Sequence, residues 1–199
     1  AAGGAAGSQS QEGAGATGGR NVLRKTGVPT DDLLRQVTPS EERLRRGPVA
    51  IFECFERIPC DPCQHACPTG AVQPFEDLND LPRVDHQLCT GCGRCIQACP
   101  GLAVFVVQED LDECSALVGL PYEYCPLPAP GDVVTLLDRQ GRAVGQGRIK
   151  KVVRPGNRGE TPVVWVIVPR GLAMTVRHIR PEGENRGADQ PTGGHHLPV

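Results

Sequence analysis

The fold of this chain is decided by a cysteine-rich stretch that occurs twice. Residues 58–72 read "IPCDPCQHACPTGAV", and residues 88–104 read "LCTGCGRCIQACPGLAV". Both copies contain C-x2-C-x3-C-P, and matching positions lie 32 residues apart. The shared cysteines are Cys60, Cys63 and Cys67 in the first copy and Cys92, Cys95 and Cys99 in the second. The repetition predicts an internal duplication, in which each copy supplies a cysteine loop, a short helix and a following strand.

The second copy has the more complete cysteine pattern. Its additional Cys89 gives C-x2-C-x2-C-x3-C-P, ending at Pro100, a spacing typical of bacterial ferredoxins that bind 4Fe-4S clusters. Three cysteines on a tight loop can face one cluster, while the fourth, after the following helix, points to another cluster. The apolar runs after the two Cys-Pro pairs, 69–73 and 101–107, are expected to return as paired strands. The sequence therefore predicts two 4Fe-4S clusters.

The eighth ligand is less obvious, because Arg57 occupies the position that matches Cys89. The nearest thiol is Cys54, three residues earlier, and a longer loop can return its thiolate to the same corner of the cluster. The alternative is a three-cysteine site with a three-iron cluster, in which Cys54 only packs in a β run. The expected ligands are Cys54, Cys60, Cys63 and Cys99 for cluster 1, and Cys67, Cys89, Cys92 and Cys95 for cluster 2.

Other roles for these cysteines fit the spacing less well. Zinc sites use two Cys-x2-Cys pairs, whereas each group here has three-plus-one spacing that ends in Cys-Pro. His65 lies between two cysteines of the first copy and is interpreted as a neighbour of the cluster. Cys114 and Cys125 have no motif around them and are interpreted as structural thiols, because a reducing compartment disfavours disulfides.

Composition excludes several classes of protein. Ten cysteines in 199 residues is below the density of about 8–10% that marks small disulfide scaffolds. There is no apolar run long enough to span a membrane and no apolar signal core at the start, so a cytoplasmic location is expected. The chain has no Gly-rich phosphate loop and no clear set of catalytic side chains. Its basic part lacks the clustered aromatics that stack bases, which argues against nucleic acid as the partner.

Charge divides the chain into two halves. Residues 48–130 contain three Arg, no Lys and twelve acidic residues, for a net charge of about −9, whereas residues 131–180 carry a net charge of about +7. Such asymmetry favours two modules that meet each other or meet partners of opposite charge. The alternative is two independently solvated surfaces. The proline-rich connector "CPLPAPGD" marks the expected boundary between the halves.

Local signals predict the secondary structure on both sides of this boundary. Thr30 and Ser40 are expected N-caps of two short helices, with Gly47 as a C-cap. The run 49–55 is the first expected strand, and β-branched runs at 132–137, 144–153, 162–168 and 172–179 predict antiparallel strands. We expect an α+β fold, in which a two-cluster bacterial ferredoxin-like domain precedes a small antiparallel β-barrel or β-sheet module. The expected parts are a disordered Gly/Ala-rich tail (1–19), a helical segment (20–47), the two-cluster domain (48–130), a basic β module (131–180) and a disordered tail (181–199) that includes His195 and His196.

Several segments add a family resemblance. They read "PSEERLRRGPVA", "ECFERIPCDPCQHACPTGA", "CTGCGRCIQACPGLAVF", "LPYEY" and "PGDVVTLLDRQGRAVGQG", and they span about residues 38–180. This set resembles the ferredoxin-like iron-sulfur subunits of flavin-dependent amino-acid dehydrogenases of the proline and hydroxyproline type. The resemblance implies two 4Fe-4S clusters on this chain, FAD, or FAD together with FMN, on partner subunits, and a hetero-oligomer with flavoprotein dehydrogenase subunits. The long N-terminal extension and the two additional thiols depart from the family pattern.

The expected function is therefore non-catalytic electron transfer. In one hypothesis the chain is a dedicated subunit that relays single electrons from a partner's reduced flavin to another flavin or acceptor. In the alternative it is a free ferredoxin that serves several redox enzymes. The appended β module and the N-terminal segment favour the dedicated subunit, because a shuttle needs little beyond its clusters.

Overall fold

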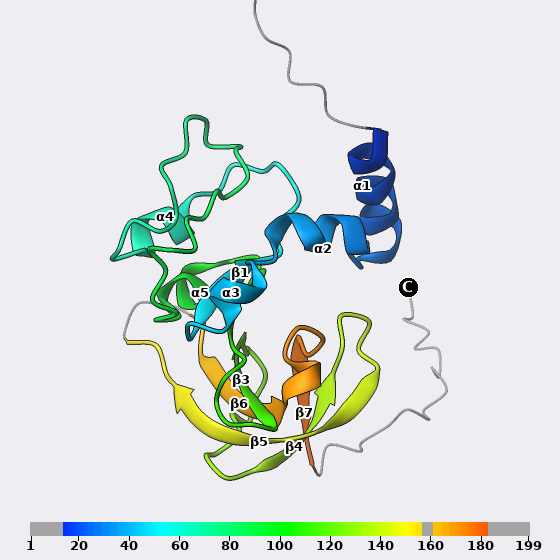
Figure 1. Cartoon of the computed structure of the whole chain (residues 1–199), viewed down its shortest axis with the longest axis vertical. Coiled ribbons are helices and arrows are strands. Elements are labelled where there is room, and N and C mark those ends of the chain that lie inside the picture. Colours follow the sequence, from blue (N-terminus) through cyan, green and yellow to red (C-terminus); the bar gives the residue numbers. More distant parts are fainter. Residues whose placement is uncertain (1–13, 157–160, 183–199) are drawn as a thin grey trace, which may run out of the picture.

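One antiparallel sheet runs through most of the chain. The computed structural model describes residues 14–156 and 161–182 (Figure 1). The sheet has seven strands in the order β1-β2-β3-β6-β5-β4-β7 and is open, with β1 and β7 at its edges. Its strands are β1 (Val49–Phe52), β2 (Val104–Gln108), β3 (Ser115–Pro121), β4 (Val133–Leu137), β5 (Ala143–Val153), β6 (Val163–Pro169) and β7 (His178–Pro181).

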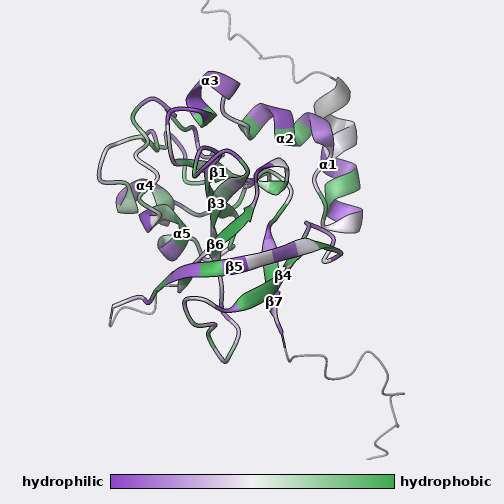
Figure 2. Cartoon of the chain, turned by 60° about the horizontal axis from the view of Figure 1, so that its bottom comes forward, coloured by the Kyte–Doolittle hydropathy of each residue, from purple (hydrophilic) through white to green (hydrophobic). Residues whose placement is uncertain are grey.

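The central strands are buried on both faces, which fits their continuous β-branched sequences. Alternate residues of β2 point to opposite sides of the sheet: Val104 and Val106 pack beside the cysteine-rich segment, whereas Phe105 and Val107 join the main core of the basic half. By contrast, β5 is mostly exposed and carries hydrophilic residues along its length (Figure 2). One apolar face of the sheet therefore packs against the cysteine-rich segment.

The sheet crosses the boundary that the sequence suggests. β3 pairs along its whole length with β6, from Ser115 opposite Pro169 to Pro121 opposite Val163. β3 is not among the expected strands, and it joins the acidic half to the basic half. The expected strand 49–55 is shorter in the structure, where it ends at Phe52 as β1. Three of the expected β-branched runs form β4, β5 and β6 with bounds close to those expected.

The expected strand at 172–179 is largely wrong. A 3-10 helix occupies Arg170–Leu172, and β7 begins only at His178. Of the apolar residues between them, Ala173 and Val176 are fully buried in the main core, and Met174 packs against it partly buried. Their hydrophobicity therefore reflects a loop that fills the core and not a strand.

Three helices precede the sheet. They are α1 (Ala14–Thr26), α2 (Asp31–Val37) and α3 (Glu41–Leu44). Residues 14–19, expected in a disordered tail, form the start of α1, which packs on α2 where Gly19 lies close to Leu33. The two expected N-caps are correct in position, and the Ser40 side chain accepts a hydrogen bond from the Arg43 N–H. The C-cap of α3 is Arg45 and not the expected Gly47.

The two tails lie largely outside the described residues, as do His195 and His196. Within residues 14–156 and 161–182, no helix is both long enough and apolar enough to cross a membrane.

Candidate metal centre

The two cysteine-rich copies form matching structures. The helices α4 (Pro62–Ala66) and α5 (Arg94–Ala98) occupy equivalent positions in the two copies and pack against each other. The duplication extends to backbone hydrogen bonds: the N–H of Glu53 donates to Ala103 at 2.8 Å, and the N–H of Asp85 donates to Ala71 at 2.8 Å. The two donors are 32 positions apart in the sequence, and so are the two acceptors, which matches the sequence repeat.

The strands of the repeat pair differently from the expectation. The run after the second Cys-Pro forms β2 and pairs with β1, with Val104 opposite Phe52. The run after the first Cys-Pro forms only an isolated bridge, between Val72 and Val84. Each run therefore returns beside the segment that leads into the other copy's cysteine loop, and the two runs do not pair with each other. This arrangement interlocks the copies.

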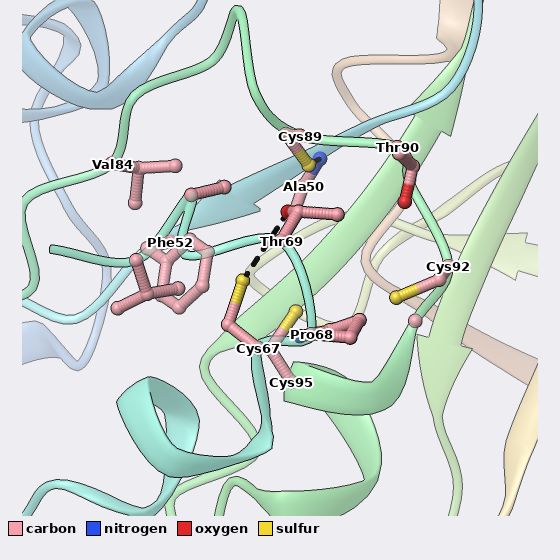
Figure 3. Close-up of a pocket in the computed structure, with 13 residues that line it drawn as sticks. Ala50, Phe52, Cys67, Pro68, Thr69, Val84, Cys89, Thr90, Cys92 and Cys95 are labelled. Atoms are coloured by element: carbon pink, nitrogen blue, oxygen red, sulfur yellow. Dashed lines mark hydrogen bonds between the residues drawn. The ribbon is translucent and has the colours of Figure 1, made fainter.

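One cavity is lined by four cysteines. They are Cys67, Cys89, Cys92 and Cys95, the set expected for cluster 2. Figure 3 shows their sulfur atoms facing a common space, with Ala50, Phe52 and Val84 on its walls. Cys92 is exposed, whereas Cys95 is buried, so the cavity reaches the surface on the Cys92 side.

A second cavity is lined by the other four of the eight expected ligands. They are Cys54, Cys60, Cys63 and Cys99, the set expected for cluster 1. Its walls include Phe52, Phe75 and Val104, together with the acidic residues Glu56 and Asp80. Phe52 lines both cavities, so a single aromatic side chain lies beside both sites.

Burial and crowding change the acidity of the buried thiols. Burial, with the negative charges that Cys99, Cys60 and Cys54 would carry, raises the pKa of Cys63 to about 12. Burial raises the pKa of Cys95 as well, and the thiols of Cys89, Cys92 and Cys67 raise it further. Four thiolates gathered in an apolar cavity repel one another and need a cationic group between them.

Hydrogen bonds to sulfur are directed at both Cys89 and Cys67. The N–H groups of Ala50 and Gly91 lie 3.3 and 3.4 Å from the sulfur of Cys89. Burial would raise the pKa of Cys67, but hydrogen bonds from the backbone at residues 69, 71 and 72 and from the Thr69 hydroxyl hold it below the ordinary value. Donors of this kind stabilise sulfur that carries negative charge, as a metal-bound thiolate does.

The donor set fits a polynuclear iron-sulfur cluster. In the described part of the chain, no group of three or more His, Cys, Asp or Glu side chains is arranged to hold a single metal ion. A zinc site would require sulfurs about 2.3 Å from one centre. Each cavity instead gathers four thiols drawn from both sequence copies, which suits a larger group with four corners. Cys54, Cys60, Cys63 and Cys99 would hold one cluster, and Cys67, Cys89, Cys92 and Cys95 would hold the other.

The remaining residues that the sequence singled out lie elsewhere. Cys114 and Cys125 are exposed free thiols that line neither four-cysteine cavity. His65 is exposed, and its ring lies 3.1 Å from a carboxylate oxygen of Asp61. Sequence reasoning missed two buried charged groups near the cysteines, Arg43 and Glu53. Arg43 lies in the charged segment 41–46 and Glu53 is a single acid in the apolar run 49–55. Neither pattern indicates that the charged side chain itself is buried, so only the fold reveals it.

Comparison with known proteins supports an iron-sulfur site. Residues 58–108 match the LdpA Fe-S cluster-binding domain. A tetrathionate reductase subunit of Archaeoglobus fulgidus is 44% identical over 55 residues, which cover 27% of this chain and 26% of that protein. Thiosulfate reductase electron transfer subunit PhsB of Salmonella typhi is 41% identical over 51 residues, which cover 23% of this chain and 26% of that protein. The chain thus spans about a quarter of the length of these two relatives.

A shorter relative is covered more fully. Pyruvate synthase subunit PorD of Methanocaldococcus jannaschii is 38% identical over 60 residues, which cover 30% of this chain and 67% of that protein. No solved structure matches the chain. Through its cysteine-rich segment, the chain belongs to the ferredoxin-like proteins that bind iron-sulfur clusters.

Proposed function

We propose that this chain is an electron-transfer subunit of a multi-subunit oxidoreductase and that it holds two 4Fe-4S clusters. The observation that carries the proposal is the pair of cavities, each lined by four cysteines drawn from both sequence copies. Relatives with similar cysteine-rich segments are named as subunits of tetrathionate reductase, thiosulfate reductase and pyruvate synthase. Bound 4Fe-4S clusters would each take up and release one electron with little movement of their ligands.

The protein's own groups prepare the two sites for this chemistry. The thiolates would hold the clusters, and apolar walls such as Phe52 and Val104 would keep water away from them. Backbone N–H groups donate to the sulfur of Cys89 and so stabilise negative charge there. Because Cys67 and Cys99 each serve the site formed mainly by the other copy, the crossed ligation fixes the two sites close together.

We further propose that the partner is a flavin-dependent dehydrogenase of the proline or hydroxyproline type. The support is the resemblance of residues 38–180, which includes the basic β module as well as the cysteine motifs. The chain carries single electrons from the partner's reduced flavin to a second flavin or an external acceptor. The substrate contacts the partner, so this chain is non-catalytic, and its site of action is the cytoplasm.

Anaerobic reduction of the purified complex tests both proposals separately. Proline or hydroxyproline is added, and the clusters are followed by electron paramagnetic resonance at times compatible with turnover. We expect cluster signals to appear with substrate and also with dithionite. If cluster signals appear with dithionite but not with the amino acid, the proposal of an amino-acid dehydrogenase partner is rejected. The proposal of a two-cluster subunit is retained in that case. Full turnover in a complex whose clusters have been removed would reject the relay itself.

The alternative, a free ferredoxin shuttle, predicts a different elution from gel filtration. Natively purified protein that elutes as a lone monomer would support the shuttle. A stable complex that contains a flavoprotein would support the dedicated subunit.

A further inference from the structure

Arg43 is a buried positive charge beside the site of cluster 2. It lies on α3 and is only 6% exposed. Its guanidinium donates four hydrogen bonds, and every acceptor is a backbone carbonyl. The acceptors are Cys89 at 2.6 Å, His86 at 2.6 Å, Pro48 at 3.0 Å and Gly47 at 3.1 Å. Arg43 therefore ties the loop that carries Cys89 to the segment that enters β1.

This loop is packed tightly against the same segment. A side chain at Gly91 would approach the Pro48 backbone to 2.7 Å, so the backbone there can come this close only because residue 91 is glycine. Two residues after Pro48, on β1, the N–H of Ala50 donates to the sulfur of Cys89. The guanidinium of Arg43 thus lies within the shell of groups that surround one cluster ligand.

The charge of Arg43 is not balanced by a carboxylate. Among the described residues, none forms an ion pair with it, and the acids of its own helix pair outward, Glu41 with Arg45 and Glu42 with Arg46. Burying a charge without a partner of opposite sign is costly. Carbonyl oxygens satisfy its hydrogen bonds but supply only partial charges. A full negative charge close to the Cys89 loop would complete the balance.

We infer that Arg43 is the counter-charge of cluster 2 and raises the reduction potential of that cluster. The inference rests on the proposed two-cluster function. A 4Fe-4S cluster with four thiolates is negatively charged, and reduction adds one further negative charge. A fixed positive charge in a poorly solvated position favours the reduced form, because net charge and exposure are among the factors that set the potential.

The effect should be confined to one of the two sites. Arg43 contacts the Cys89 loop, and none of its hydrogen bonds reaches a residue that lines the cluster 1 cavity. The arginines near cluster 1 already have acidic partners: Arg177 pairs with Glu53, Arg24 with Glu56, and Arg57 with Asp80. The N-terminal helical segment thereby has a specific role, which is to bring one unbalanced charge to cluster 2.

The test is a redox titration of the iron-loaded protein, with dithionite as reductant and electron paramagnetic resonance as the readout. The variants are Arg43→Gln, which removes the charge, and Arg43→Lys, which keeps it. Arg46→Gln is the matched control, because Arg46 lies just after α3 with an exposed side chain. Cys92→Ser identifies which signal belongs to cluster 2.

We expect Arg43→Gln to disfavour reduction of cluster 2 about tenfold, equivalent to a midpoint lower by about 59 mV for one electron. Arg43→Lys and Arg46→Gln should leave both midpoints near the wild-type values. A variant Arg43→Gln that loads only half of the iron, while Arg43→Lys loads all of it, would also support the counter-charge. Unchanged midpoints in fully loaded Arg43→Gln would overturn the inference. Equal losses of cluster 2 in both Arg43 variants would also overturn it. Arg43 would then only hold the loop in place through its hydrogen bonds.

Discussion

Cys67 and Cys99 end two short helices with almost the same backbone conformation. Cys67 has φ −80° and ψ 109°, and Cys99 has φ −81° and ψ 109°. The N–H of each caps its helix by donating to the carbonyl three residues earlier, at Gln64 and Ile96. Both residues then leave the helix in an extended conformation, which directs each sulfur to the cavity formed by the other copy's loop. The crossed arrangement follows from this shared local geometry.

The first prediction concerns Cys54, the ligand that departs from the repeat. Wild-type protein should bind about eight irons per chain if both sites hold four-iron clusters. Cys54→Ala should lower the iron content or convert cluster 1 to a three-iron species, because Cys54 is the fourth thiol of that cavity. Iron analysis and electron paramagnetic resonance measure both outcomes.

Cys114→Ser and Cys125→Ser are the controls for this experiment. Both residues are exposed and line neither four-cysteine cavity, so both clusters should persist in each variant. Unchanged cluster content in Cys54→Ala would remove Cys54 from the ligand set, and loss of a cluster in either control would show a misassigned ligand.

The second prediction concerns the turn after the first Cys-Pro. Gly70 has φ +67° and open space around its missing side chain. Gly70→Ala should therefore destabilise the protein by about 1–2 kcal/mol through backbone strain alone. The control is Gly101→Ala in the second copy, which also has open space but no positive φ, and which should be neutral or slightly stabilising. Thermal loss of the cluster absorbance at a fixed scan rate would rank the variants; equal midpoints for the two would contradict the strain argument.

Much of the site can be predicted from the sequence because its signal is local. The spacing of Cys89, Cys92 and Cys95 reflects one tight loop, and the 32-residue repeat extends the same geometry to the first copy. The strands β4, β5 and β6 are equally visible, since β-branched runs separated by turn residues need no distant information.

The strand β3 escapes sequence-based prediction for a physical reason. Its sequence "SALVGLP" contains Gly119 and Pro121, which usually weaken or end strands. In the fold, the ring of Trp165 on β6 packs over Gly119, and a side chain there would lie 3.2 Å from the ring. The glycine makes room for an aromatic partner 46 positions away in the sequence, and a local pattern cannot contain that information.

The charge asymmetry is only partly informative. Glu53 of the acidic half pairs with Arg139 and Arg177 of the basic half, at 2.6 Å in each case. Counting charges suggests that the halves meet, but it cannot identify which acid is buried. That depends on the position of Glu53 directly after β1, where the sheet holds it against the basic half.

The third prediction concerns this buried network. Glu53→Gln should destabilise the protein by about 3–5 kcal/mol, because it leaves Arg177, with 3% of its side chain exposed, without an acidic partner. Glu56→Gln is the matched control: its pair with Arg24 is largely exposed, and its loss should cost less than about 1 kcal/mol. Midpoints of thermal unfolding under identical loading compare the two. Similar losses in both variants would show that the network is no more important than a surface pair.

The fourth prediction is a pH dependence that arises from His178 at the start of β7. Its ring lies 5.9 Å from that of Tyr122 and 5.2 Å from that of Tyr124, and burial lowers its pKa. Above the ordinary histidine pKa of about 6.5, both the folded and unfolded chains hold His178 neutral. As the pH falls below that value, the unfolded chain takes up a proton that the folded chain does not, so stability falls until the pH reaches the lowered folded pKa. Comparing thermal midpoints at about pH 7.5 and about pH 5.5, wild type should lose more stability than His178→Gln. His86, whose pKa is also lowered by burial, contributes equally to both chains, so the difference isolates His178; identical losses in the two chains would assign the pH dependence to other groups.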